Sequence, residues 1–221
     1  MSTLADDDHP SATAAGVPRW PAIVALFFVG GLLALVSSEL TVGPSWLPLL
    51  VIAALTIPIT IASRRESHVW RRRMAFVGLG TVTLAVVGSA VLLVERLLSP
   101  GGVDPGPLLF GAGAIWLANC GTFAVWYWEI DGGGPGKRRR DGHVSSDFLF
   151  PQLQVGDGTS SGGWWPGFLD YLFVAWNAST AFSPTDTLIL TRRAKVLMMI
   201  QSLIALVTVA VLAARAINTL K

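Results

Sequence analysis

A cluster of polar side chains interrupts an apolar stretch near the carboxyl end of the chain. Pro184 removes a backbone hydrogen-bond donor there and pushes the residue before it toward an extended conformation. Hydroxyls and freed carbonyls of this kind replace the hydration shell of ions in selectivity filters. The pattern predicts a short helix, a polar break and a final apolar helix, as in a pore loop. The candidate pore or polar-site residues are Asp170, Asn177, Ser179, Thr180, Ser183, Thr185 and Asp186.

A simpler interpretation of the same residues stays open. The segment could be a short amphipathic helix at the membrane surface, followed by a polar turn before the last apolar helix. Asp186 would then cap the following turn, because Asp is favoured at such positions. Asp170 is the stronger functional candidate, since an ionisable group inside a membrane segment is costly unless it is paired or hydrated. Its alternative role is that of a residue at the membrane border.

Other chemistry has little support in the sequence. His9, His68 and His143 are far apart in expected loops, and Cys120 is the only cysteine. No nucleophile motif, phosphate-binding loop or pair of catalytic carboxylates stands out. We therefore expect no enzyme activity, no catalytic residue, no cofactor and no metal site.

Composition places the chain in the membrane class. Hydrophobic residues make up 52% of its 221 residues and charged residues 14%, whereas a soluble domain carries about 25% charged residues. This balance excludes a disordered chain, and a single Cys excludes a disulfide scaffold. It also argues against a nucleic-acid partner. The lipid bilayer is the expected surrounding, and the plasma membrane the expected location.

Five uncharged runs are long enough to cross a hydrocarbon core of about 30 Å. A sixth stretch, Phe168–Phe182, is shorter and contains Asp170 and Asn177, which predicts a re-entrant, interfacial or strained segment. The predicted fold is all-α, a polytopic transmembrane helix bundle of five or six spans with a re-entrant or pore-like half-helix before the last. The five runs are Trp20–Val36, Trp46–Ala62, Met74–Val94, Pro107–Trp128 and Ala194–Ala214.

Four regions follow from this division. Residues 1–18 read as a disordered polar tail, and residues 19–130 as a four-helix transmembrane region. Residues 131–163 form a basic and then Gly-rich loop. Residues 164–221 combine the pore-loop-like half-helix with the final transmembrane helix.

Basic residues set the predicted orientation. Lys and Arg are enriched in cytoplasmic loops, so the loops Ser63–Arg73 and Glu129–Gly163 are predicted to be cytoplasmic. If Phe168–Phe182 crosses the membrane, Arg192 and Arg193 lie outside and the chain has six spans. If it dips in and returns, they stay inside and the chain has five. A third arrangement, with both basic loops outside, conflicts with the charge rule.

The C-terminal block also carries a resemblance. The order DYLFVAWNASTAFSPTDTLILTRRAKVLMMIQSLIALVTVAVLAARAINTL resembles the pore-helix, filter and inner-helix block of two-helix potassium channels. Together with the upstream FAVWYWEI, GGGP and DFLFP, it resembles a family of uncharacterised multi-pass bacterial membrane proteins of actinobacterial type. Thr180 and Asp186 match the ends of the channel motif TVGYGD, but both glycines are missing and one residue is extra. The resemblance implies a channel-like protein with a degenerate filter.

Two functions from different classes remain as hypotheses. In the first, half-helices from several copies, most simply four, surround an ion path, so the chain is a homo-oligomer. In the second, the chain is a non-conducting scaffold or accessory subunit whose 131–163 loop binds a protein partner or anionic lipid. In either case we expect Gln201 and Asn119 to hydrogen-bond between helices. The small residues Ala114, Ala118 and Gly121 should permit close helix packing.

Overall fold

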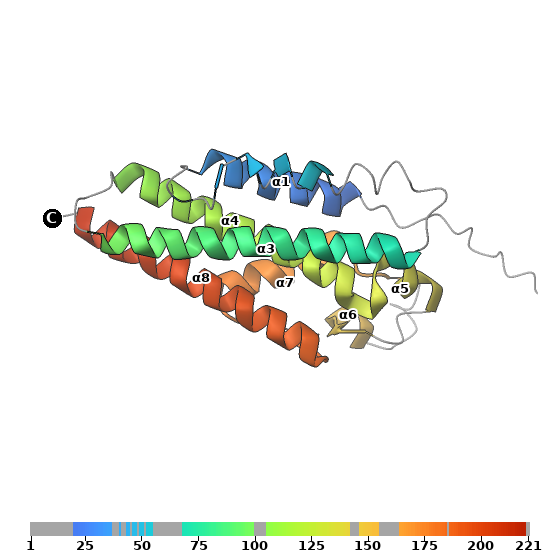
Figure 1. The fold of residues 1–221 in the computed structure, drawn as a ribbon. Coiled ribbons are helices and arrows are strands. Elements are labelled where there is room, and N and C mark those ends of the chain that lie inside the picture. The colour runs from blue at the N-terminus through green and yellow to red at the C-terminus, as the bar shows by residue number, and fades with distance from the viewer. Residues whose placement is uncertain are drawn as a thin grey trace, which may run out of the picture.

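The computed structural model describes residues 20–36, 40, 43–44, 46–47, 49–50, 52–54, 68–99, 105–141, 146–154, 164–184 and 186–219. This part of the chain is mostly helical (Figure 1). The longer helices are α1 (Trp20–Leu35), α3 (His68–Leu98), α4 (Pro105–Ile130), α7 (Phe168–Thr180) and α8 (Arg192–Thr219). The shorter elements are η2 (Asp131–Gly133), α5 (Pro135–Asp141), β1 (Phe148–Leu149), α6 (Pro151–Gln154) and β2 (Leu188–Ile189).

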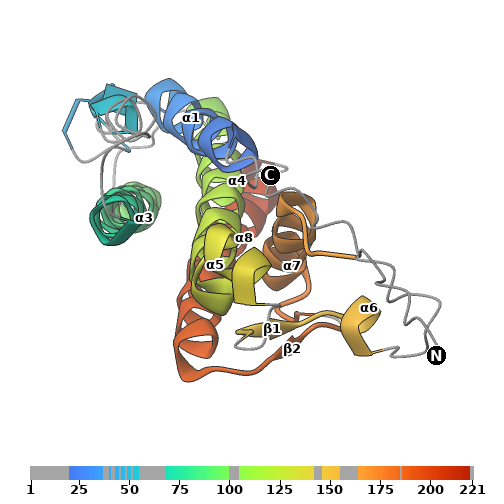
Figure 2. The same cartoon turned by 90° about the vertical axis from the view of Figure 1, so that its right-hand side faces the viewer.

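Helix α4 is the centre of the bundle. It packs against α1, α3, α7 and α8, and Figure 2 shows it between α1 and α8. Small side chains make this possible, because Ala114 and Ala118 are buried in the core. At Gly121, an added Cβ would lie only 2.7 Å from Cγ2 of Val29 in α1. The predicted role of these three small residues in close packing is therefore confirmed.

Three helical stretches of the described chain are long and apolar enough to cross a membrane. They are Arg72–Leu98, Gly106–Arg138 and Arg192–Arg215, so the prediction of a helical membrane protein is supported. The predicted run Trp20–Val36 forms α1, which at 16 residues is shorter than these three. Most of the run Trp46–Ala62 and the whole tail 1–18 lie outside the described residues.

The helices extend beyond the predicted apolar runs. Helix α3 begins at His68, so Arg71, Arg72 and Arg73 lie in its first turns and not in the predicted loop. A run predicted from hydropathy stops at the first charged residue. The helix itself continues through the Arg residues, because Arg is a good helix former. The 131–163 segment also differs from a plain loop, because it contains η2, α5, β1 and α6.

Helix α7 and the chain after it form a hairpin alongside α4. α7 lies antiparallel to α4, since Tyr171 contacts Asp131 at the end of α4 and Ser179 contacts Trp116 in its middle. The chain then turns back, and β2 pairs antiparallel with β1, with Phe148 opposite Ile189. Both ends of the hairpin therefore lie at the end of the bundle where α4 finishes and α3 and α8 begin (Figure 1).

Candidate functional site

A buried glutamine joins α8 to helices α4 and α7. Gln201 is fully buried, and its Nε2 donates to the carbonyl of Ala175 at 2.6 Å and to Oγ of Ser179 at 2.8 Å. Its Oε1 accepts a hydrogen bond from the Tyr127 hydroxyl. Its own carbonyl accepts one from Nδ2 of Asn119 at 3.1 Å. The predicted interhelical hydrogen bonding of Gln201 and Asn119 is confirmed, and Gln201 holds α7 in place between α4 and α8.

Two more contacts hold the C-terminal half of α7. Nε1 of Trp116 donates to the Ser179 carbonyl at 3.3 Å, and Oγ of Ser202 donates to the Ala178 carbonyl at 3.2 Å. The Trp116 and Trp176 rings meet edge to face, with centroids 4.9 Å apart. Polar contacts between helices are favourable in a lipid surrounding, where small polar residues otherwise lack partners. The C-terminal half of α7 is thus fixed to α4 and α8.

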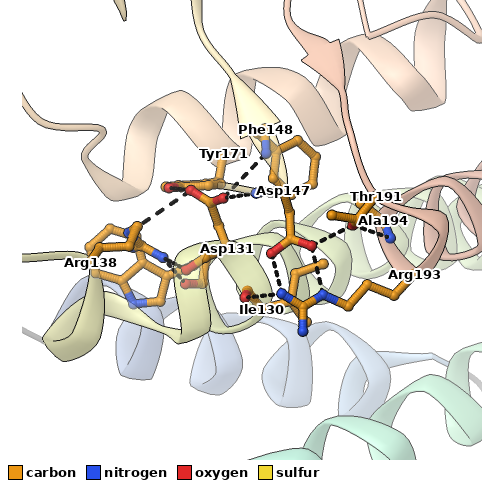
Figure 3. Close-up of polar contacts among 10 residues, drawn as sticks. Ile130, Asp131, Arg138, Asp147, Phe148, Tyr171, Thr191, Arg193 and Ala194 are labelled. Atoms are coloured by element: carbon orange, nitrogen blue, oxygen red, sulfur yellow. Dashed lines mark hydrogen bonds and ion pairs between the residues drawn. The ribbon is translucent and has the colours of Figure 1, made fainter. Parts of the chain in front are cut away.

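A buried aspartate organises the other end of α7 (Figure 3). Asp131 is fully buried, and its Oδ1 accepts the backbone amides of Asp147 and Phe148 at 2.6 and 3.2 Å. Its Oδ2 accepts the Tyr171 hydroxyl at 2.5 Å and lies 4.0 Å from Nε of Arg138. Each lone pair of a buried carboxylate that finds a donor lowers its burial cost. One side chain thus joins the end of α4, strand β1 and helix α7.

Arg138 balances this carboxylate from α5. Its side chain is 3% exposed, and its Nη1 donates to the carbonyls of Trp128 and Asp131, both at 2.7 Å. The guanidinium also lies over the rings of Trp128 and Tyr171, 4.8 and 5.1 Å from their centroids. Cation–π contacts of this kind are stronger when desolvated. Arg138 is therefore a structural residue, although the sequence placed it in a loop expected to bind partners.

A second acidic residue secures the return end of the hairpin. Asp147 is fully buried and pairs with Arg193 through two hydrogen bonds of 2.6 Å, from Nε and Nη2. Thr191 donates its hydroxyl to the same carboxylate. Leu190 donates its amide to the Asp147 carbonyl at 2.9 Å. The amide of Ala194 in turn donates to Oγ1 of Thr191 at 3.4 Å, so Thr191 caps α8 (Figure 3).

These two carboxylates and two guanidiniums compensate one another. We call this set, with Tyr171 and Thr191, the polar junction: Asp131, Arg138, Asp147, Tyr171, Thr191 and Arg193. The two Asp and two Arg side chains have opposite charges in equal number, and the described contacts join carboxylates to donors. Nothing in this arrangement activates a nucleophile. Within the described part of the chain, no three His, Cys, Asp or Glu side chains are grouped as metal ligands.

Asp170, the stronger of the two acidic candidates, lies in the first turn of α7. Its Oδ2 accepts the backbone amide of Gly167 at 2.7 Å, so the carboxylate reaches back to the residue that begins the helix. This geometry favours a helix-capping role for Asp170.

The other candidates do not gather around one space within a single copy. Ser179 is buried in the Gln201 contacts. Asn177 and Thr180 donate to carbonyls of their own helix, those of Phe173 at 2.8 Å and Trp176 at 2.9 Å. Ser183 is partly buried and Asp186 exposed. Thr185 lies outside the described residues.

Comparison with known proteins gives no further assignment. No protein-family model, no curated protein and no solved structure matches this chain. The likeness to potassium channels and to a bacterial membrane family therefore stays a prediction.

Sequence reasoning missed the polar junction. Asp131 directly follows an apolar span, and Asp147 directly precedes the aromatic segment Phe148–Phe150. These two acidic residues lie on either side of the basic run Lys137–Arg140. This alternation of charge indicates local ion pairing and not a uniformly basic loop, so it could have pointed to the polar junction.

Proposed function

We propose that this chain is a channel-like membrane protein that conducts ions only as an oligomer. The α7 hairpin is then re-entrant: α7 enters the bilayer from the end that carries the polar junction, and the chain returns to that same end. Several copies would bring their hairpins around one axis. A single hairpin cannot surround an ion, so assembly is part of the proposal.

The length of the hairpin is less than a full crossing. Its tip lies beside Trp116, about 21 Å of helix before Ile130 at about 1.5 Å per residue. A hydrocarbon core is about 30 Å thick. With the junction at one surface, the tip would lie well inside the bilayer and would not reach the opposite surface.

The observation that carries the proposal is the exposure of this tip. Thr180, Ala181 and Phe182 are exposed, and the chain from Ala181 to Pro184 is not helical. Irregular backbone at membrane depth is tolerated only where protein or a water-filled cavity satisfies it. A single copy leaves residues 180–182 of this turn exposed. Neighbouring copies and water would supply the contacts that this turn needs.

The tip is suited to a cation but differs from a potassium filter. The carbonyl end of a helix carries partial negative charge, and α7 directs that end toward the turn. Phe182 adopts a left-handed backbone with φ of 54°, at a place where potassium filters use glycine. Ser183 and Pro184 follow. We therefore propose a weakly selective cation path in place of stacked rings of carbonyls.

The test is ion flux with purified protein in liposomes, together with the mass of the particle. Thr180→Val removes an exposed hydroxyl at the tip and should change the flux several-fold. Thr81→Val is the matched control, because Thr81 is also exposed and also donates to its own helix at 2.9 Å, but from α3. Absence of flux across voltages, pH values and cations, with a monomeric particle, would contradict the proposal.

A second candidate function has its own supporting observation. Ser179, Asn177 and Thr180 all make hydrogen bonds within one copy, as expected if the hairpin is purely structural. The chain would then be a non-conducting scaffold or accessory subunit that presents the 131–163 segment to a partner. A photo-crosslinker at exposed Leu153 should capture one stable partner in cells. Failure to do so would count against this alternative.

A further inference from the structure

A groove opens between α3 and α8 at the basic end of the bundle. Its volume is about 670 Å³. Helix α4 contributes to the groove between α3 and α8. The groove lies where α3 and α8 begin and α4 ends (Figure 1). The groove is lined by Arg72, Phe76, Trp126, Ile130, Arg192, Arg193, Val196 and Leu197.

One wall of the groove is a fixed aromatic stack. The Phe76 and Trp126 rings are stacked, with centroids 5.6 Å apart and planes inclined by 13°. Trp126 is held in orientation by a 2.9 Å hydrogen bond from Nε1 to Oγ1 of Thr83. The guanidinium of Arg72 lies over Phe76, 5.2 Å from the ring centroid. The wall is therefore apolar, flat and ordered, and it ends in a positive charge.

The charges at this end are incompletely compensated within the described residues. Arg193 is paired with Asp147, but no described carboxylate pairs with Arg72 or Arg192. The Nε of Arg72 is buried and has no hydrogen-bond partner among the described residues. Two guanidiniums thus remain available beside an apolar groove, and Arg192 is exposed. This is the complement of a molecule with an anionic head and an apolar tail.

We propose that the groove binds one anionic phospholipid. Its phosphate lies at the end where Arg72 and Arg192 are found, and an acyl chain runs along Phe76 and Trp126 toward Val196 and Leu197. Basic pockets between transmembrane helices bind anionic headgroups in this way. The lipid would link α3 to α8. The site differs from the 131–163 loop suggested by the sequence, and it does not depend on ion conduction.

Lipid binding to the purified full-length chain in neutral detergent tests this proposal. Native mass spectrometry would compare phosphatidylglycerol with phosphatidylcholine of identical acyl chains. We expect phosphatidylglycerol to be retained more tightly. Each of Arg72→Gln and Arg192→Gln should weaken it about 5-fold, and the double variant about 30-fold. Affinity for phosphatidylcholine should change little, which reports that the variants still fold.

Two controls distinguish this site from general electrostatics. Lys195→Gln removes the same charge from an exposed position on α8 that does not line the groove, and it should leave the preference intact. Inorganic phosphate at millimolar concentration should fail to displace the lipid. Equal retention of both lipids, an equal loss in Lys195→Gln, or displacement by phosphate would overturn the proposal.

A photoreactive acyl chain provides an independent readout of position. Phosphatidylglycerol with a diazirine in its tail should label the α8 peptide that contains Val196 and Leu197. Labelling spread evenly over the exposed faces of α3 and α8 would indicate bulk lipid and would contradict a specific site.

Discussion

Nε2 of Gln201 lies 2.8 Å from Oγ of Ser179 and joins α8 to α7 across 22 residues of sequence. The same side chain also contacts Ala175 and Tyr127, so it joins three helices at one point. These contacts fix α7 against α4 and α8 within a single copy.

Removing this side chain should loosen α7. Gln201→Leu deletes three side-chain hydrogen bonds, which join Gln201 to the Tyr127 hydroxyl, the Ala175 carbonyl and Oγ of Ser179. Hydrogen bonds between membrane helices average about 0.6 kcal/mol each, so we expect a loss of about 2 kcal/mol. Ser202→Ala removes one bond, to the Ala178 carbonyl, and should cost about 0.6 kcal/mol. Unfolding by SDS titration in mixed micelles measures both, and equal losses would contradict the central role of Gln201.

The pair Asp147–Arg193 should stabilise the return end of the hairpin. The Asp147 side chain is 0% exposed and that of Arg193 is 53% exposed. Arg193→Met would leave a buried carboxylate with fewer donors, and breaking a buried pair costs about 3–5 kcal/mol. Because Arg193 is half exposed and therefore screened, we expect about 1–3 kcal/mol.

Lys195→Met is the control for this pair, since Lys195 is exposed two residues away on α8. Its free energy of unfolding should stay within about 0.5 kcal/mol of the parent value. If Arg193→Met is equally mild, the ion pair does not hold the hairpin.

Much of the fold could be predicted from the sequence because apolar length is a strong signal. The runs Met74–Val94, Pro107–Trp128 and Ala194–Ala214 lie within α3, α4 and α8. The sixth stretch was predicted to begin at Phe168, where α7 begins, and to be too short for an ordinary crossing. The sequence did not decide whether this stretch crosses the membrane or returns to the side from which it entered. Hydropathy carries no information about the direction of the chain that follows.

The polar junction could not be predicted for a different reason. Whether Asp131 or Arg138 is solvated or buried depends on which segments meet in space. Asp131 is 16 residues from the amide of Asp147 and 40 residues from the hydroxyl of Tyr171. The alternation of acidic and basic residues indicates ion pairing, but no local pattern shows which of these residues meet. Charges after an apolar span are usually solvated, so a solvated loop was the natural expectation for the 131–163 segment.

Close packing of α1 on α4 should depend on Gly121. An added Cβ there would lie 2.7 Å from Cγ2 of Val29, so Gly121→Ala would force the helices apart and cost about 1–3 kcal/mol. At Gly113, in the same helix, an added Cβ meets nothing within 4 Å. Gly113→Ala should be neutral or stabilise by up to about 1 kcal/mol through helix propensity. Equal effects of the two variants on SDS unfolding would argue against the close contact.

The last prediction concerns the path of the chain through the membrane. If the hairpin is re-entrant, Gly167 before α7 and Leu190 after the turn lie on the same side, and Ile217 near the end of α8 lies on the other. All three are exposed in the structure, and the single native cysteine, Cys120, can be replaced by Ala. Single cysteines placed as Gly167→Cys, Leu190→Cys and Ile217→Cys would then be treated with a membrane-impermeant maleimide.

The charge rule places the Arg-rich end in the cytoplasm. It therefore predicts that the cysteines at 167 and 190 react only after cells are permeabilised. The cysteine at 217 should react in intact cells. The comparison between 167 and 190 is decisive even if the whole molecule is inverted, since a return to the same side requires that they behave alike. Opposite behaviour at these two positions means that α7 and the chain after it cross the bilayer. The turn around Phe182 would then not be the tip of a re-entrant hairpin, and the proposed ion path would lose its physical basis.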